Sequence, residues 1–231
     1  ATILVCRVFI LRMKTVKTGA ESGSILKQYG EFGNLLKLSK VRKVFTLQFF
    51  MIIGLFGLVP NVAIWLSTNY SMNATQIGLC YMQGGIGGII GNTLCGYFIN
   101  KGHRGQLITI GSLITAFFMF LSARDIFPPA FIGVFFAGMM FGGSFRMPSF
   151  QIIITELIPI NLRGRMMALS MIVSNITMGL GGIISLPFLK LENGVLTGIE
   201  AITLAGSVSL LVVPFLVRIL EREIGQAKEL Y

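Results

Sequence analysis

The sequence predicts an all-α fold, a polytopic membrane helical bundle with six transmembrane helices. Hydrophobic residues make up 54% of the 231 residues and charged residues only 12%, whereas an average soluble domain is about 25% charged. Long apolar segments alternate with polar connections, and Lys and Arg gather in every second connection. This alternation indicates helices that thread a bilayer, because positively charged loops stay in the cytoplasm. The net charge of +10 is therefore assigned to membrane topology, and no nucleic-acid partner is expected.

Each predicted span is long enough to cross a hydrocarbon core of about 30 Å. Only a helix satisfies its own backbone hydrogen bonds there, so every span is predicted to be helical. The spans cover residues 44–68, 75–99, 107–123, 130–157, 166–189 and 201–217. Outside them, we interpret 1–11 as the end of a truncated span, 12–43 as a basic cytoplasmic linker and 218–231 as a cytoplasmic tail. Within the linker, residues 25–38 either form an amphipathic helix on the anionic leaflet or are merely solvated.

The distribution of basic residues sets the predicted orientation. Beyond residue 11, only Arg124 and Lys190 fall in connections assigned to the outer side, and Arg146 lies within a span. Trp65 and Tyr70 mark the outer end of the first span, since such rings favour the headgroup level. The protein is thus expected in the cell (inner/cytoplasmic) membrane with its C-terminus in the cytoplasm.

The second span, 75–99, is rich in glycine. Its small residues recur at helical spacing, which lets two helix backbones approach closely, so a neighbouring helix is predicted to pack here. One stripe holds Gly84, Gly88, Asn92 and Gly96, and the next holds Gly87, Gly91 and Cys95. These glycines do not form a nucleotide-binding loop, because they lie inside an uncharged span and position 90 is isoleucine.

Two predicted cytoplasmic connections carry a candidate gate. Its residues are Gly96, Asn100, Lys101 and Arg104 in the first connection, and Glu156, Arg163 and Arg165 in the second. At helix ends, guanidinium groups bind a carboxylate or terminal carbonyls in one conformation and release them in another. A two-state gate needs such contacts. The alternative is that these charges only fix orientation.

Polar residues inside the spans are candidates for a substrate pathway. An ionised Arg146 is costly in a membrane and is expected to face the bundle interior or a water-filled cavity, where it would attract an anionic group or a carboxylate. Alternatively, its long side chain snorkels toward the cytoplasmic interface, helped by Pro148. The intramembrane amides either line the path or lock helices together. They are Asn61, Gln83, Asn92, Gln151 and Asn175.

Nothing in the sequence predicts an enzyme or a cofactor. Cys6, Cys80 and Cys95 lie in apolar segments without metal-ligand spacing, so neither a disulfide framework nor a metal site is expected. His103 is the single histidine and lies in a polar loop. No acidic residue lies near the middle of a span, and no nucleophile–base pair is evident.

The two connections resemble signatures of the major facilitator superfamily. Residues 96–105, GYFINKGHRG, resemble Gly-x-x-x-Asp-Arg/Lys-x-Gly-Arg-Arg/Lys, with Asn100, His103 and Gly105 departing from the pattern. Residues 156–165, ELIPINLRGR, are similar to a Glu-x6-Arg-Gly segment that follows the tenth helix of many members. Residues 145–148, FRMP, also resemble the drug and sugar efflux branch.

This resemblance implies the C-terminal half of a twelve-helix transporter, built as two inverted three-helix repeats with the second and fifth spans at equivalent positions. Such a protein moves a small-molecule substrate by alternating access in the lipid bilayer. Efflux as an antiporter, with a coupling proton bound by carboxylates of the N-terminal six-helix half, is expected. The alternative function is a non-transporting six-span membrane protein, either a split-gene remnant or a scaffold.

Overall fold

The structure is a computed structural model, and it describes residues 33, 36–100, 102, 104–122, 124, 131–158 and 160–228, without the side chains of 161 and 223–228. The expectations for residues 1–11, for most of the linker, and for Lys101 and His103 lie outside this part of the chain.

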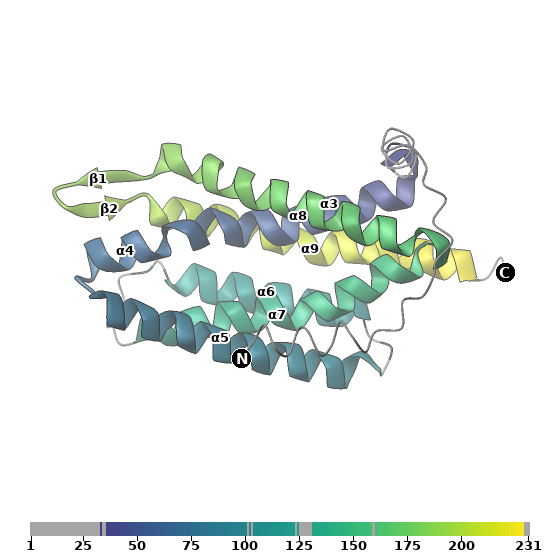
Figure 1. Cartoon of the computed structure of the whole chain (residues 1–231), viewed down its shortest axis with the longest axis horizontal. Helices are drawn as coiled ribbons and strands as arrows, with labels where there is room; N and C mark the ends of the chain where they lie inside the picture. Colours follow the sequence, from purple (N-terminus) through teal and green to yellow (C-terminus); the bar gives the residue numbers. More distant parts are fainter. Residues whose placement is uncertain are drawn as a thin grey trace, which may run out of the picture.

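In the described part of the chain, six long helical segments run back and forth along one axis (Figure 1). The first is broken into two helices by a 3-10 turn, and a short hairpin joins the last two. In chain order, the elements are α3 (Ser39–Leu58), η1 (Val59–Asn61), α4 (Val62–Asn69), α5 (Ala74–Ile99), α6 (Arg104–Ser122), α7 (Ile132–Glu156), η3 (Ile160–Leu162), α8 (Arg163–Ser185), η4 (Leu186–Phe188), β1 (Lys190–Glu192), β2 (Val195–Thr197) and α9 (Ile199–Lys228).

Length and composition make four of these segments candidate membrane spans, Ser39–Asn69, Arg104–Ser122, Arg163–Phe188 and Ile199–Arg222. Helices α5 and α7 are also long, at 26 and 25 residues, but glycine and polar residues dilute their hydropathy. Helix α7 packs against both α5 and α6. A helix that contacts protein on several sides needs less apolar surface than one that faces lipid.

The helices pack as two groups of three. One group is α5, α6 and α7, the other is α3, α8 and α9, and α6 joins them by packing against α9. The helix–helix contacts are symmetric: when α3 is exchanged with α7, α5 with α8 and α6 with α9, the main contacting pairs remain the same. Helices α3 and α7 run in opposite directions (Figure 1). This arrangement confirms the predicted pair of inverted repeats, which are α3–α6 and α7–α9.

The glycine-rich faces of α5 and α8 occupy equivalent positions in the two repeats. The sequence predicted a close neighbour for α5, and the structure shows that this neighbour is α7. Added side chains at Gly87 and Gly91 would collide with backbone carbonyls of α7. In the second repeat, a Cβ atom at Gly181 of α8 would lie 2.9 Å from the carbonyl carbon of Phe56 in α3. Because glycine has no side chain, the helix backbones can cross equally closely in both repeats.

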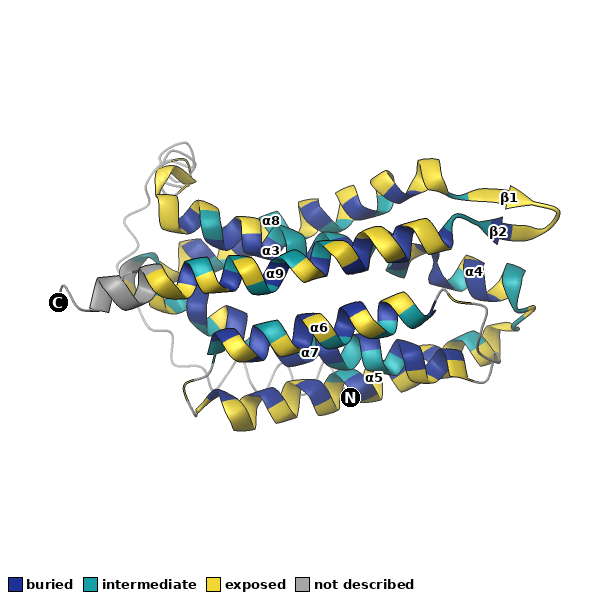
Figure 2. Ribbon diagram, turned by 180° about the vertical axis from the view of Figure 1, so that it is seen from behind, coloured by how far each residue is buried: buried dark blue, intermediate teal, exposed yellow. Residues whose placement is uncertain are grey.

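Buried residues line the contacts between helices, and exposed residues cover their outward faces (Figure 2). Trp65, which the sequence placed at the headgroup level, is only 4% exposed. Its ring packs edge-on against Tyr70, with centroids 5.5 Å apart. The β1–β2 hairpin covers α4 here, which the sequence did not reveal, and the position of Trp65 at the headgroup level stays a prediction.

Candidate functional site

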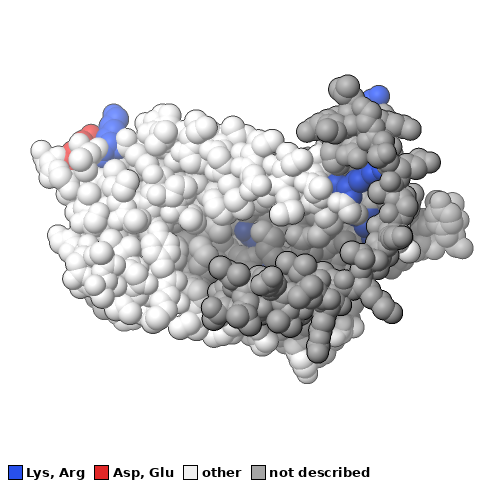
Figure 3. Space-filling model, viewed as in Figure 1, with Lys and Arg blue, Asp and Glu red and all other residues white. Residues whose placement is uncertain are grey.

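The two ends of the bundle differ in chemistry, and we name them by their residues. The Arg104 end is where α6 begins and α7 ends, and the hairpin end is where α4 meets β1 and β2. Basic groups gather at the Arg104 end, whereas the surface between the ends is almost uncharged (Figure 3). An uncharged band between charged ends suits a protein that crosses a membrane.

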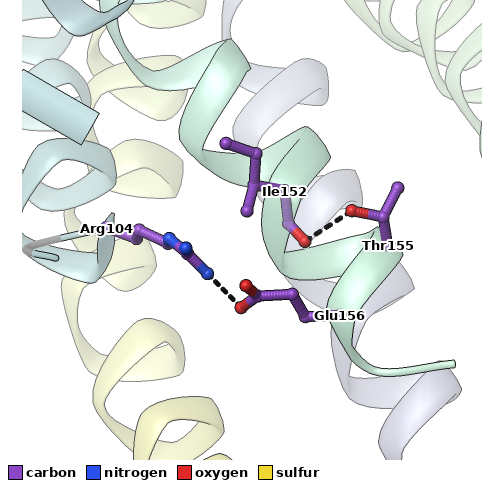
Figure 4. Close-up of polar contacts among 4 residues, drawn as sticks. All are labelled: Arg104, Ile152, Thr155 and Glu156. Carbon is purple, nitrogen blue, oxygen red and sulfur yellow. Dashed lines mark hydrogen bonds and ion pairs between the residues drawn. The ribbon is translucent and has the colours of Figure 1, made fainter. Parts of the chain in front are cut away.

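At the Arg104 end, an ion pair joins the two predicted gate connections. Arg104 is the first residue of α6, and its Nη1 contacts a carboxylate oxygen of Glu156, the last residue of α7 (Figure 4). The Thr155 hydroxyl donates to the Ile152 carbonyl at 2.9 Å within the last turn of α7. The ion pair is partly solvated, since the two side chains are 32% and 40% exposed.

A second carboxylate lies beside the start of α6. Gly105 is buried, and a side chain there would overlap the carboxylate of Glu221 in α9. An acidic group is stabilised near a helix N-terminus, where backbone N–H groups are unpaired. The sequence analysis missed Glu221, because only the packing of α9 against α6 brings it here. Its position just after the last apolar segment was the available signal.

The other predicted gate residues in the described part of the chain lie at the C-terminal end of α5 and at the start of α8. Asn100 is exposed at the C-terminal end of α5. A side chain at Gly96 would meet no atom within 4 Å, so this glycine is not needed for close packing. Arg163 and Arg165 are exposed in the first turn of α8.

Arg146 lies in the bundle interior, with its side chain only 1% exposed. Its Nη2 donates to the Met51 carbonyl of α3 at 2.6 Å, and its Nη1 donates to the Ser112 hydroxyl of α6 at 3.3 Å. Its Nε has no hydrogen-bond partner. The side chain therefore ties α7 to two other helices rather than snorkelling to the Arg104 end. No carboxylate pairs with it among the ion pairs found for the described residues.

Two buried amides, one in α3 and one in η1, fasten this span to α8. The Asn61 Nδ2 donates to the Ser185 hydroxyl at 3.0 Å and to the Gly57 carbonyl at 3.1 Å. The Gln48 Nε2 donates to the Ser170 carbonyl at 2.8 Å and to the Ser174 hydroxyl at 2.5 Å, while its Oε1 accepts from the Ser170 hydroxyl at 3.1 Å. The structure thus places Asn61 in a helix contact. The sequence analysis did not single out Gln48, although an amide in an apolar span was a visible signal.

The remaining predicted pathway amides are exposed on the helices, and they are Gln83, Asn92, Gln151 and Asn175. Asn92 lines a hollow of about 550 Å³ between α5 and α7, together with Ser144, Tyr81 and Gly85. No charged side chain lines it. Gln83 instead lies against Gly133 of α7.

The cysteines of the described helices pack in the interior. Cys80 and Cys95 are buried and free, and the Cys95 sulfur lies 3.3 Å from the Ser149 hydroxyl. Within the described ranges, no three His, Cys, Asp or Glu side chains are grouped so that they could hold a metal ion.

Comparisons with known proteins agree with this architecture. A search of curated proteins gave no match. The family model described as Major Facilitator Superfamily matches residues 44–229, which include nearly all of the six helical segments described above. The chain therefore belongs to the major facilitator superfamily of membrane transporters.

Proposed function

We propose that this chain is the C-terminal half of a secondary active transporter that moves a small solute by alternating access. The observation that carries the proposal is the ion pair between Arg104 and Glu156. Arg104 belongs to the first inverted repeat and Glu156 to the second, so the pair crosses the boundary between them. Alternating access rocks the two six-helix halves against each other around a central site, and it needs contacts within a half that differ between the two states.

The solvation of this ion pair suits a contact that has to break in each cycle. Partly exposed pairs contribute about 0–1 kcal/mol, so little free energy separates the paired and unpaired states. The Arg104 Nε is buried without a partner, and Glu221 lies beside the next residue. Glu221 is therefore the acceptor that we assign to Arg104 when α6 and α7 separate.

The hollow beside Asn92 is the part of the solute pathway that this half contributes. Asn92 and Ser144 offer hydrogen bonds from α5 and α7 within an otherwise apolar and glycine-lined wall. Exposed amides on α7 and α8, Gln151 and Asn175, belong to the surface that the N-terminal six-helix half covers. Polar groups on membrane helices normally face protein or water rather than lipid.

Arg146 positions α7 and requires a negative partner. A buried cation without a carboxylate is strongly unfavourable in a membrane interior. We assign that partner to a carboxylate of the N-terminal half or to an anionic group of the solute. The coupling proton is likewise assigned to carboxylates of that half, with efflux from the cytoplasm and the Arg104 end on the cytoplasmic side.

Thiol labelling of the complete transporter tests alternating access without knowing the solute. The reporter is Ser144→Cys in a background where Cys6, Cys80 and Cys95 are alanine, and the probe is a membrane-impermeant maleimide. Right-side-out and inside-out vesicles should both label. Glu156→Gln should raise labelling from the Arg104 end about two- to fivefold, because the broken pair contributes up to about 1 kcal/mol.

The matched control is Arg163→Gln, which removes a nearby basic residue outside the ion pair and should leave both rates unchanged. Labelling from a single face in every variant would contradict alternating access and would favour a scaffold.

A further inference from the structure

The hairpin between α8 and α9 carries a polar contact at the opposite end of the bundle from Arg104. Its strands pair Leu191 with Leu196 in an antiparallel register. The turn between them uses Asn193 and Gly194 with positive φ angles of 52° and 80°. Such a two-residue turn matches the twist of the strands and makes a compact hairpin. The hairpin extends beyond the helices and lies next to α4 (Figure 1).

Asn69, the last residue of α4, binds the backbone of this hairpin twice. Its Nδ2 donates to the Leu196 carbonyl at 3.0 Å, and its Oδ1 accepts from the Leu196 N–H at 2.8 Å. The Thr68 hydroxyl lies 2.8 Å from both Oδ1 and the Ile64 carbonyl oxygen, and its single proton can be donated to either of them. The carboxamide therefore satisfies both backbone groups of a strand residue, as a neighbouring strand would. The Leu196 side chain is 9% exposed and packs in a cluster with Trp65 and Leu66 of α4.

A break in the helix separates α4 from the rest of its span. The 3-10 turn Val59–Asn61 separates it from α3 and contains Pro60. Proline has no N–H and interrupts the helical hydrogen bonds, and a 3-10 stretch inside a long helix often marks a hinge. The hairpin contact holds the far end of this eight-residue helix, and Val62, Trp65 and Leu66 pack it against the bundle.

The inverted repeats relate this contact to the ion pair at the other end. Exchanging the repeats maps the α3–α4 span onto α7, and the α8–α9 connection onto the α5–α6 connection. Asn69 ends the first span of one repeat and binds the α8–α9 connection. Glu156 ends the first span of the other repeat and binds Arg104, just after the α5–α6 connection. The two contacts are thus counterparts at opposite ends.

We propose that Asn69 and Leu196 form a latch that closes the hairpin end, as the counterpart of the Arg104–Glu156 pair. The proposal rests on the alternating-access function proposed above. Release of the latch lets α4 swing at η1 and opens the hollow beside Asn92 toward the hairpin end. The two closures differ in chemistry, since one is ionic and the other consists of neutral hydrogen bonds. Salt screens the first and leaves the second nearly unchanged.

The same labelling assay on the complete transporter tests the latch. With the Ser144→Cys reporter, Asn69→Leu removes both hydrogen bonds and should raise maleimide labelling from the hairpin end on the order of tenfold, as expected for two net bonds. The matched control is Ser67→Ala in α4, because the Ser67 hydroxyl bonds only to the Ile64 carbonyl of its own helix, at 2.9 Å. This control should label like the parent.

Combining variants separates the latch from a merely structural contact. Glu156→Gln should lower labelling from the hairpin end, and Asn69→Leu with Glu156→Gln should return the ratio of the two faces toward the parent value. If Asn69→Leu does not fold, Asn69→Asp tests the same contact. It keeps the acceptor for the Leu196 N–H but loses the donor, so a several-fold rise is expected.

The possible failures are distinguishable. Unchanged labelling in both Asn69 variants, with a shift in Glu156→Gln, would overturn the latch and leave alternating access in place. Unchanged labelling in all of these variants would overturn the proposed function itself. Raising the salt concentration should increase labelling from the Arg104 end, and an increase at the hairpin end instead would contradict the chemical difference between the two closures.

Discussion

Arg104 is the first residue of α6 and pairs with Glu156, the last residue of α7, so an ion pair ties the first helical repeat to the second. Both side chains remain partly solvated, at 32% and 40% exposure. The contact is therefore suited to holding one conformation without making it irreversible.

A double-mutant cycle measures this ion pair. Arg104→Ala and Glu156→Ala, alone and together, should give a coupling free energy of about 1 kcal/mol or less in low salt, because solvent screens the charges. The measurement is chemical unfolding in detergent micelles, repeated in concentrated NaCl, where the coupling should shrink. The cycle of Glu156→Ala with Arg163→Ala serves as the control and should show none. A coupling above about 3 kcal/mol would contradict a solvated pair.

Substitutions of Arg146 should destabilise the protein more when they leave a charge buried than when they remove it. Arg146→Met removes the cation and fills similar volume, so thermal stability should change by about 1–2 kcal/mol or less. Arg146→Lys keeps the charge, but an ammonium group cannot reproduce the planar contacts to Met51 and Ser112, so it should cost about 2–4 kcal/mol. Stability in micelles decides the order. This order is expected if the negative partner is an anionic group of the solute, which is absent from the assay. A methionine variant that is less stable than the lysine variant would assign the partner to a carboxylate of the N-terminal half.

Glycines of α5 should respond to alanine according to their surroundings. Gly87→Ala places a methyl group against the Ala137 carbonyl, and overpacking of this kind typically costs about 1–3 kcal/mol. Gly96→Ala is the matched control, because no atom lies within 4 Å of the added methyl and alanine favours helix by about 1 kcal/mol. Melting temperatures in micelles should fall for the first and stay or rise for the second. Equal effects would argue against the α5–α7 crossing.

Gln48 should contribute to the α3–α8 contact by hydrogen bonding. Gln48→Leu removes its three hydrogen bonds with Ser170 and Ser174. Contacts of this type between membrane helices average about 0.6 kcal/mol in double-mutant cycles. The coupling of Gln48→Leu with Ser170→Ala should therefore lie near that value, as measured by unfolding in micelles. A coupling of zero would contradict the geometry, and Gln48→Leu with Thr93→Ala, on a different helix, provides the additive reference.

The sequence predicted the helical segments well because their signal is local. Charge alternation and apolar length are read along the chain, and they identified α5 and α7 even though the candidate membrane spans in the structure are the other four segments. Glycine spacing predicted that α5 has a close neighbour but not that the neighbour is α7. Which helix lies next to α5 depends on the arrangement of all six segments.

The candidate site was less predictable because its contacts are long-range. The pairing of Arg104 with Glu156 followed from two motifs, whereas Glu221 and Asn69 became visible only once α9 met α6 and the hairpin met α4. Arg146 was expected in the interior and lies there, but its partners Met51 and Ser112 are an ordinary backbone carbonyl and a serine. Neither carries a pattern that distinguishes it in the sequence.

The diluted hydropathy of α5 and α7 bears on how the protein is made. The other four helical segments are apolar enough to partition into the bilayer one at a time as they leave the ribosome. Helix α5 falls outside this set, and its glycine face meets the complementary face of α7 only when α7 arrives. During biosynthesis, the close α5–α7 crossing can therefore form only after α6 and α7 have been translated.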